Sequence, residues 1–395
     1  MRLAYVCADL GVPVFGRKGC SIHVQEVVRA LARHGVRVDL FAVRCEGAKP
    51  PGLDAVRVHE LPAIPQGDPG VRERATLAAN PQLREALDRE GPFDVVYERY
   101  SLWSFAAMEY ARDRGVPGLL EVNAPLIEEQ AEHRTLVHRG AALLVAERVF
   151  GAAAALLAVS KEVAAYLERF PGTRGRVHVA PNGVDPARFP AGLRPSRPGP
   201  PGSYTVGFVG TLKPWHGLGI LAEAVALLRR GDPHVRLLVV GDGPGRESLE
   251  TDLRARGLRG AADLTGAVAP EDVPGLLASM DVAVAPYPRL SHFYFSPLKA
   301  YEYMAARLPV VASRVGQLAE LIRPWDNGLL CPPGDAGALA EALALLREWP
   351  ALRRRMGEAA RADVLRRHTW DALARRVLGL AGRRCEAPTA EGCAT

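Results

Sequence analysis

The chain alternates short apolar runs with longer amphipathic stretches from one end to the other. In its first part, runs with the character of β-strands occur at Leu3–Ala8, Val36–Val43, Phe93–Glu98, Gly118–Val122, Ala155–Val159 and Val177–Ala180. Stretches with helical periodicity, such as Ile22–Ala32 and Glu162–Phe170, lie between them. Strands that alternate with helices along a sequence predict a parallel sheet covered by helices on both faces.

A segment rich in proline and glycine interrupts this alternation once. Its sequence, Pro195-Ser-Arg-Pro-Gly-Pro-Pro-Gly202, is typical of a linker. Strand-like runs then resume at Thr205–Val209, Val235–Val240, Ala262–Leu264, Val282–Ala285 and Val310–Ala312, and helical patterns follow at Ala338–Leu346, Leu352–Val364 and Trp370–Leu380. We therefore expect an α/β protein with two doubly wound, Rossmann-like domains.

The predicted domain boundaries follow from these patterns. The first domain comprises residues 1–190, the linker 191–203 and the second domain 204–368. A last helix at 369–382 is expected to return to the first domain, and residues 383–395 form a short polar tail. A length of 395 residues agrees with two domains, because one hydrophobic core rarely serves so long a chain.

Composition excludes several classes of protein. Hydrophobic residues make up 48% and charged residues 24%, which indicates a globular protein rather than a disordered one. No apolar run is long enough to span a membrane, and the six cysteines show neither a disulfide framework nor zinc-finger spacing. The net charge of +6 suits an anionic substrate or attachment to acidic lipid, and an arginine-rich solvated surface is the alternative. No RNA-binding signature is present. We expect a cytoplasmic protein that does not bind nucleic acid, and leave peripheral contact with the inner face of the membrane open.

Turns that follow predicted strands are where open parallel sheets bind ligands. The first such turn runs from Ala8 to His23 and carries Arg17 and Gly19 immediately before a helix. Glycine at such a place permits close approach of the backbone to a phosphate or a sugar. A flexible surface loop is the alternative.

The second domain opens with a similar turn, Gly210-Thr-Leu-Lys-Pro-Trp-His216-Gly217. Lys213 is placed to neutralise a diphosphate leaving group as negative charge develops on it, and a loop lysine that faces solvent is the alternative. His216 could contact a ligand or pack beside Trp215. Later strands lead to Gly241, expected in a tight turn that lines a nucleotide site, and to Gly266-Ala-Val268, whose backbone could meet a base.

The stretch from His292 to Ala306, which runs into the apolar segment Leu308–Ser313, carries the most informative chemistry. A helix is predicted to begin at Ser296, which suits the N-cap, with Pro297 in its first turn. The free N–H groups of such a helix start can bind an anion. Farther along, the Glu302 carboxylate could accept hydrogen bonds from ribose hydroxyls, and Lys299 lies at the spacing that lets two side chains meet. The alternative is an ordinary capped helix that packs Leu298, Tyr301 and Met304 into a core.

Polar residues also end two strands of the first domain. They lie in Tyr97-Glu-Arg99-Tyr100 and in Glu121-Val-Asn123-Ala-Pro-Leu-Ile-Glu128-Glu129. At these places they would face a cleft between domains. The alternative is that they form a helix cap or a salt bridge. The chain has no serine-hydrolase elbow, zinc-protease motif or P-loop, and Arg246 occupies the last glycine position of a dinucleotide fingerprint.

Taken together, these motifs resemble the retaining glycosyltransferases of family 4 (glycosyl transferases group 1), which have the GT-B architecture with an inter-domain cleft. The motifs that carry the resemblance are the glycine loop before Ser21-Ile-His-Val-Gln-Glu-Val-Val, Glu121-Val-Asn-Ala-Pro-Leu, Val159-Ser160, Pro181-Asn-Gly-Val-Asp185, Gly210 to Gly217, Gly241-Asp-Gly-Pro, Glu302-Tyr-Met-Ala-Ala and Pro309-Val-Val-Ala-Ser. Their order and spacing cover nearly the whole chain.

The resemblance implies a role for each candidate residue. Glu302 would hold the ribose hydroxyls, Lys213 would assist the leaving group, and Asn123 would lie near the sugar as a third catalytic residue. The remaining contacts with the nucleotide sugar would come from Gly19, Gly210, Thr211, His216, Gly241, Gly266, Val268, Tyr294, Phe295, Ser296, Pro297 and Leu298. The acceptor would be bound by Arg17, His23, Arg99, Glu121, Asn123 and Glu128.

Three positions depart from the family pattern. Tyr294 occupies the place of the first glutamate of a Glu-x7-Glu pair, so backbone groups from Phe295 to Leu298 would take over its contact with the sugar. Thr211 and His216 stand where many relatives have arginine and lysine, which leaves Lys213 as the cation of the turn. Asn123 stands where relatives have a histidine.

The resulting expectation is transfer of a hexose or amino-hexose from a nucleotide-diphosphate sugar, with UDP as the nucleotide, to a hydroxyl of a small molecule, a glycan or a lipid. The anomeric configuration would be retained and neither a metal nor another cofactor would be needed. Such enzymes serve the synthesis of bacterial glycoconjugates, polysaccharides or natural products. A GT-B epimerase or phosphorylase, and a non-catalytic protein that binds sugar nucleotides, are the alternatives.

Overall fold

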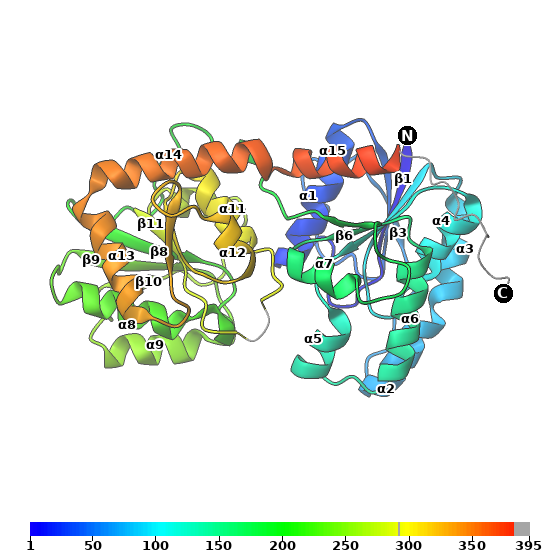
Figure 1. The fold of residues 1–395 in the computed structure, drawn as a ribbon, viewed down its shortest axis with the longest axis horizontal. Coiled ribbons are helices and arrows are strands. Elements are labelled where there is room, and N and C mark those ends of the chain that lie inside the picture. The colour runs from blue at the N-terminus through cyan, green and yellow to red at the C-terminus, as the bar shows by residue number, and fades with distance from the viewer. Residues whose placement is uncertain (291–292, 383–395) are drawn as a thin grey trace. The chain divides into compact units, whose positions relative to one another are not determined.

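The computed structural model describes residues 1–290 and 293–382, and the predicted tail at 383–395 lies outside them. The chain divides into two compact units: unit 1 comprises Met1–Pro181 and the chain from Asp371 onward, and unit 2 comprises Asn182–Trp370. Each unit contains one parallel sheet flanked by helices (Figure 1). The predicted fold class is therefore confirmed.

The sheet of unit 1 has seven strands in the order β3-β2-β1-β4-β5-β6-β7, and every neighbouring pair is parallel. Its strands are β1 (Arg2–Cys7), β2 (Arg37–Ala42), β3 (Arg57–Glu60), β4 (Val95–Arg99), β5 (Gly118–Val122), β6 (Ala155–Ala158) and β7 (Val177–Val179). Its helices are α1 (Gly19–Arg33), α2 (Pro69–Ala78), α3 (Asn80–Glu90), α4 (Ala106–Arg114), α5 (Leu126–His133), α6 (Arg139–Ala152), α7 (Lys161–Leu167) and α15 (Trp370–Ala381).

The sheet of unit 2 has six parallel strands in the order β10-β9-β8-β11-β12-β13. Its strands are β8 (Tyr204–Val209), β9 (Val235–Val240), β10 (Ala262–Leu264), β11 (Val282–Ala285), β12 (Val310–Ser313) and β13 (Gly328–Cys331). Its helices are α8 (Leu218–Arg229), α9 (Arg246–Ala255), α10 (Val273–Leu277), α11 (Leu298–Ala305), α12 (Gly316–Leu321), α13 (Ala336–Glu348) and α14 (Pro350–Arg367), with short 3-10 turns η1 (Pro186–Arg188) and η2 (Pro214–His216).

Helices cover both faces of the second sheet. Apolar side chains of α8, α9 and α13 pack in the core on one face, those of α10, α11 and α12 pack in the core on the other, and α14 contributes to both. The central strands are buried along both faces, which explains why they read as continuous apolar runs rather than as alternating ones.

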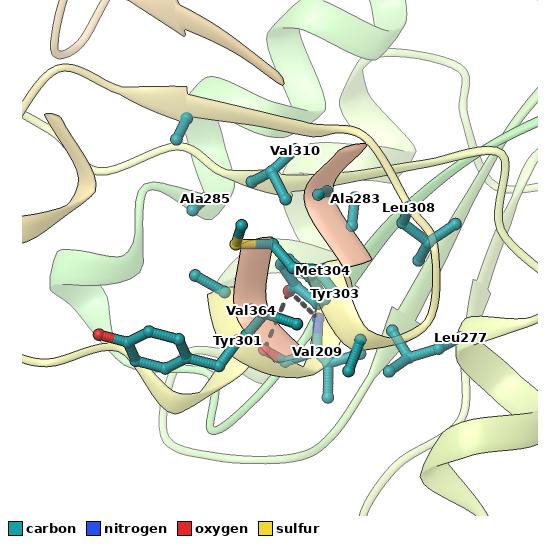
Figure 2. Packing of buried hydrophobic residues seen from close by; sticks show 14 of the residues in the cluster. Val209, Leu277, Ala283, Ala285, Tyr301, Tyr303, Met304, Leu308, Val310 and Val364 are labelled. Carbon is teal, nitrogen blue, oxygen red and sulfur yellow. Dashed lines mark hydrogen bonds between the residues drawn. The ribbon is translucent and has the colours of Figure 1, made fainter. Parts of the chain in front are cut away.

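A buried tyrosine fixes the helix that carries Glu302 to the central strand of this sheet. The backbone N–H of Val209, at the end of β8, donates to the Tyr303 hydroxyl over 2.7 Å, as Figure 2 shows. Tyr301, Tyr303 and Met304 are fully buried in the surrounding cluster. Because these contacts lie in the same helix as Lys299 and Glu302, they set the position of both side chains.

The chain crosses between the units earlier than its proline-rich segment. Asn182 already hydrogen-bonds to Ser296, and Phe189 is buried in the core of unit 2, so the segment 182–190 packs with the second unit. The helix α15 returns to unit 1, where Asp371 forms an ion pair with Arg33 of α1.

The strands β3 and β13 have no counterpart among the predicted strands. Both are four residues long and lie at the edges of their sheets, and β3 has the mostly polar sequence Arg57-Val-His-Glu60. Such short segments carry little periodic signal, so only their pairing with a neighbouring strand identifies them.

Candidate functional site

Glycine turns gather at the carboxyl edge of the second sheet. The chain leaves β8 at Gly210, β9 at Gly241 and β10 near Gly266, and the Gly241 N–H donates to the Gly266 carbonyl over 3.0 Å. A β-carbon on Gly241 would lie 2.2 Å from the Gly210 carbonyl oxygen, and φ is +130° there. Only glycine permits this approach. Three of the predicted donor-binding positions therefore come together.

The turn after β8 contains Thr211, Lys213 and His216. The Nδ1 atom of His216 donates to the Thr211 carbonyl over 2.6 Å. Burial, with the nearby Lys299 ammonium, lowers the pKa of His216 to about 3, so the ring is neutral near pH 7. His216 thus cannot replace the positive charge of a lysine. Lys213 is partly exposed, and its ammonium lies 5.3 Å from the centre of the Trp215 ring.

Helix α11, which carries Lys299 and Glu302, begins at Leu298, and its N-cap is Pro297. The prediction that Ser296 caps this helix is wrong, because its hydroxyl accepts a hydrogen bond from the Asn182 N–H instead, over 3.1 Å. Asn182 also donates from its amide to the Ser296 carbonyl, over 2.8 Å. Ser296 therefore ties the start of α11 to the segment that enters unit 2.

Tyr294, which stands where the family has the first glutamate of its Glu-x7-Glu pair, lies among aromatic rings. Tyr294 is 9% exposed, and its ring centre lies 4.4 Å from that of Phe295. Phe295 in turn meets Phe293 edge-on. The segment before α11 thus offers a ligand mainly aromatic surface and backbone groups.

Glu302 faces an arginine that the sequence analysis did not identify. Arg188 of η1 donates from Nη1 to Glu302 Oε1 over 2.7 Å and from Nη2 to the Pro270 carbonyl over 2.8 Å. Lys299, by contrast, turns toward Gly210, so the expected meeting of Lys299 and Glu302 does not occur. Val268 packs at the edge of the core formed by this face of the sheet.

A buried carboxylate organises the carboxyl edge of the first sheet. Glu121, at the end of β5, interacts through Oε1 with His23 Nε2 over 2.7 Å and with Arg99 Nη1 over 3.1 Å. Asn123 donates from its amide to the same oxygen, and Tyr97 donates from its hydroxyl to Oε2. Four of these residues were predicted to bind the acceptor or to lie near the sugar, and the structure brings them together.

The charge of Glu121 is fixed by these neighbours. Burial alone would raise the pKa of its carboxyl, but the His23 ring and the Arg99 guanidinium lower that pKa to about 2. A carboxylate with both oxygens already engaged is a poor general base. It can instead orient His23, Arg99 and Asn123 toward a ligand.

Three further residues of unit 1 were predicted to bind a ligand. Arg17 and Gly19 are exposed at the start of α1. Glu128 interacts with Tyr166 and Tyr100 instead. Glu98, which belongs to the predicted strand-end motif but was assigned no role, is a second buried carboxyl. It accepts a hydrogen bond from Ser104, and burial raises its pKa to about 7.

Two kinds of feature are absent from the described part of the chain. Among residues 1–290 and 293–382, no group of three or more histidine, cysteine or acidic side chains is arranged to hold a metal ion. In the same part of the chain, no helix combines the length and the hydrophobicity needed to cross a membrane.

A hollow of about 420 Å³ opens elsewhere in unit 2, between Met280, Leu308 and Arg353. It adjoins the residues that precede β11 and β12, at the amino ends of these strands. It is therefore remote from the glycine turns, and open parallel sheets bind ligands at the opposite edge.

Comparison with known proteins agrees with this geometry. A family model described as Glycosyl transferases group 1 matches residues 203–348, and one described as Glycosyltransferase Family 4 matches residues 17–188. The D-inositol 3-phosphate glycosyltransferase of Pseudarthrobacter chlorophenolicus is 30% identical over 87% of this chain and 85% of its own length.

Solved structures share the fold. Sucrose-phosphate synthase from Thermosynechococcus elongatus superposes with a TM-score of 0.72 at 22% identity, over 96% of this chain and 98% of its own. Anabaena HepE in complex with UDP-glucose superposes with a TM-score of 0.69 at 19% identity, over 96% of this chain and 98% of its own.

Proposed function

The chain belongs to the group 1, family 4 glycosyltransferases, and on that premise we propose that it transfers a hexose or amino-hexose from a UDP-sugar to an acceptor hydroxyl. The observation that carries the proposal is the gathering of Gly210, Gly241 and the α11 helix with Glu302 at the carboxyl edge of the second sheet. Glycine turns and a carboxylate suit a diphosphate and a ribose, respectively.

In this proposal unit 2 binds the donor. Glu302 accepts hydrogen bonds from the ribose hydroxyls, and its pairing with Arg188 orients the carboxylate for them. Gly210, Gly241 and Gly266 let the backbone approach the nucleotide, while Lys213 helps to neutralise the departing diphosphate. Because the chain itself supplies cations at this edge, the reaction proceeds without a metal.

Unit 1 binds the acceptor through His23, Arg99 and Asn123, which Glu121 holds in place. The configuration at the anomeric carbon is retained, and a donor phosphate oxygen takes the proton of the acceptor hydroxyl. This route fits the engagement of both Glu121 oxygens, since a double displacement would need a free carboxylate. The named relatives make D-inositol 3-phosphate the first acceptor to test. The donor is a cytoplasmic metabolite, so we place the enzyme in the cytoplasm.

Donor binding can be tested by thermal stability with a panel of nucleotide sugars. A ligand that binds only the folded protein raises its melting temperature by mass action. UDP-sugars should stabilise the wild type and the Glu348→Ala control, whose substitution lies at the exposed end of α13, but not Glu302→Ala. Equal stabilisation of Glu302→Ala, or none of the wild type by any nucleotide sugar, would refute the proposed donor site.

A further inference from the structure

Lys299 carries a buried ammonium group that nothing described above uses. Its side-chain nitrogen is inaccessible to solvent, and no residue in the described part of the chain accepts a hydrogen bond from it. Burial lowers the pKa of Lys299 to about 7. A buried cation without a counter-charge is costly, so its presence needs a reason.

The position of this nitrogen is fixed by the packing of its helix. The Tyr303 hydroxyl anchors α11 at Val209, one residue before the Gly210 turn (Figure 2). The Lys299 nitrogen consequently lies 3.1 Å from where a β-carbon on Gly210 would stand. Since Gly210 has no side chain, the ammonium lies directly against the backbone of this half-buried turn.

Aromatic rings explain how the charge is tolerated before a ligand arrives. The nitrogen lies 4.1 Å from the centre of the Phe208 ring and 5.7 Å from that of Tyr287, both within cation–π range. The titratable groups that face it are His216 and Tyr287, and at pH 7 both are neutral because burial lowers the pKa of the first and raises that of the second. Lys213, in the same turn as His216, adds a further positive charge.

We propose that Lys299 is a second cation, beside Lys213, that contacts the diphosphate of the donor at the Gly210 turn. This inference rests on the proposed function and adds a residue to its site. The neutral His216 cannot supply positive charge in the turn after β8, and Lys299 reaches the same turn from α11. Diphosphate oxygens would give the ammonium the acceptors that it lacks among the described residues.

Replacement of Lys299 by methionine tests the proposal through two opposite effects. Methionine has a similar length and no charge, so Lys299→Met should raise the melting temperature of the free protein. The same variant should bind a nucleoside diphosphate about 10- to 100-fold more weakly, because a charge-assisted hydrogen bond is lost. Lys161→Met, at an exposed position of α7, is the matched control and should leave the affinity for the nucleoside diphosphate unchanged.

Calorimetric titration with UDP, GDP and ADP at pH 8 supplies the readout. Contact with diphosphate should restore the proton of Lys299, so the wild type should take up close to one proton on binding, and Lys299→Met none. Proton uptake is measured by repeating the titration in two buffers of different ionisation enthalpy. Equal affinity and equal proton uptake in the wild type and Lys299→Met would overturn the role of Lys299 and leave the proposed function standing. No binding of any diphosphate to the wild type would overturn both.

Discussion

Arg188 and Glu302 form an ion pair over 2.7 Å, with side chains that are 22% and 20% exposed. Arg188 also donates to the Pro270 carbonyl, which holds the guanidinium between η1 and the loop after β10. Because Arg188 engages Oε1, the second oxygen of Glu302 remains for a ligand. The pair thus positions the carboxylate that we assign to the ribose.

Replacing Arg188 by methionine should weaken donor use without changing the chemical step. The Glu302 carboxylate would lose its orienting partner, and the KM for the donor should rise about 3- to 10-fold while kcat changes little, as for an interaction of about 1 kcal/mol. Steady-state kinetics with varied donor concentration measures this. Arg197→Met, which removes an exposed ion pair with Asp263, is the control. An unchanged KM in Arg188→Met would contradict the positioning role.

Most of the fold could be predicted because its central strands are apolar along both faces. The runs Val235–Val240 and Val282–Ala285, for example, were predicted at the bounds that β9 and β11 have. The start of α11 could not be predicted from local signals, since Ser296 has the right chemistry for a cap but is recruited by Asn182, 114 residues earlier. Contacts between segments so distant in sequence override local propensity.

Glu121→Gln should destabilise unit 1 in a pH-dependent manner. The folded protein holds the pKa of this carboxyl at about 2, well below its unfolded value, so the stabilisation is present above about pH 4.5 and is lost as the pH falls toward 2. At pH 7 the variant should lose about 3 kcal/mol of unfolding free energy, because the buried Arg99 guanidinium remains without its carboxylate. Denaturant unfolding at pH 7 and pH 3 measures the difference, which should shrink at the lower pH. A loss of equal size at both pH values would count against the ionic role of Glu121.

Glu98→Gln should have the opposite dependence on pH. Burial raises the pKa of this carboxyl to about 7, so its contribution to stability is full below about pH 4.5 and is lost as the pH rises through 7. The variant should match the wild type at pH 4.5 and exceed it at pH 8.5, by on the order of 2–3 kcal/mol. Melting temperatures at the two pH values test this, with the exposed Glu85→Gln as a control. A variant that is less stable than the wild type at pH 8.5 would show that the Glu98 carboxylate is needed in its charged form.

Gly241→Ala should disrupt the donor edge of unit 2. Its β-carbon would lie 2.2 Å from the Gly210 carbonyl oxygen at a backbone angle that favours glycine, so the turns after β8 and β9 must separate. We expect a loss of roughly 2–4 kcal/mol in stability together with weaker nucleotide binding. Gly219→Ala lies in α8, with only Asp252 near its added carbon, and should be neutral or slightly stabilising. Melting temperature and UDP affinity, measured on both variants, test these two expected effects. Wild-type values of both in Gly241→Ala would contradict the close packing of these turns.

The candidate site was only partly predictable for a physical reason. Glycine turns and polar residues at strand ends can be recognised in the sequence. The structure brings four of the predicted polar residues together, His23, Arg99, Glu121 and Asn123. The direction in which a side chain points depends on tertiary packing and cannot be predicted from local sequence. Spacing alone paired Lys299 with Glu302, yet the anchoring of α11 on β8 turns the lysine to Gly210, and Arg188 reaches the glutamate from η1.

The most direct test of the account is analysis by nuclear magnetic resonance of the product formed from UDP-hexoses and D-inositol 3-phosphate or another hydroxyl acceptor. We predict that the wild type consumes one of these donors only when an acceptor is present, and that it releases UDP and a glycoside with the anomeric configuration of the donor. Isomerisation of the sugar without transfer, or a glycoside of inverted configuration, would contradict the account.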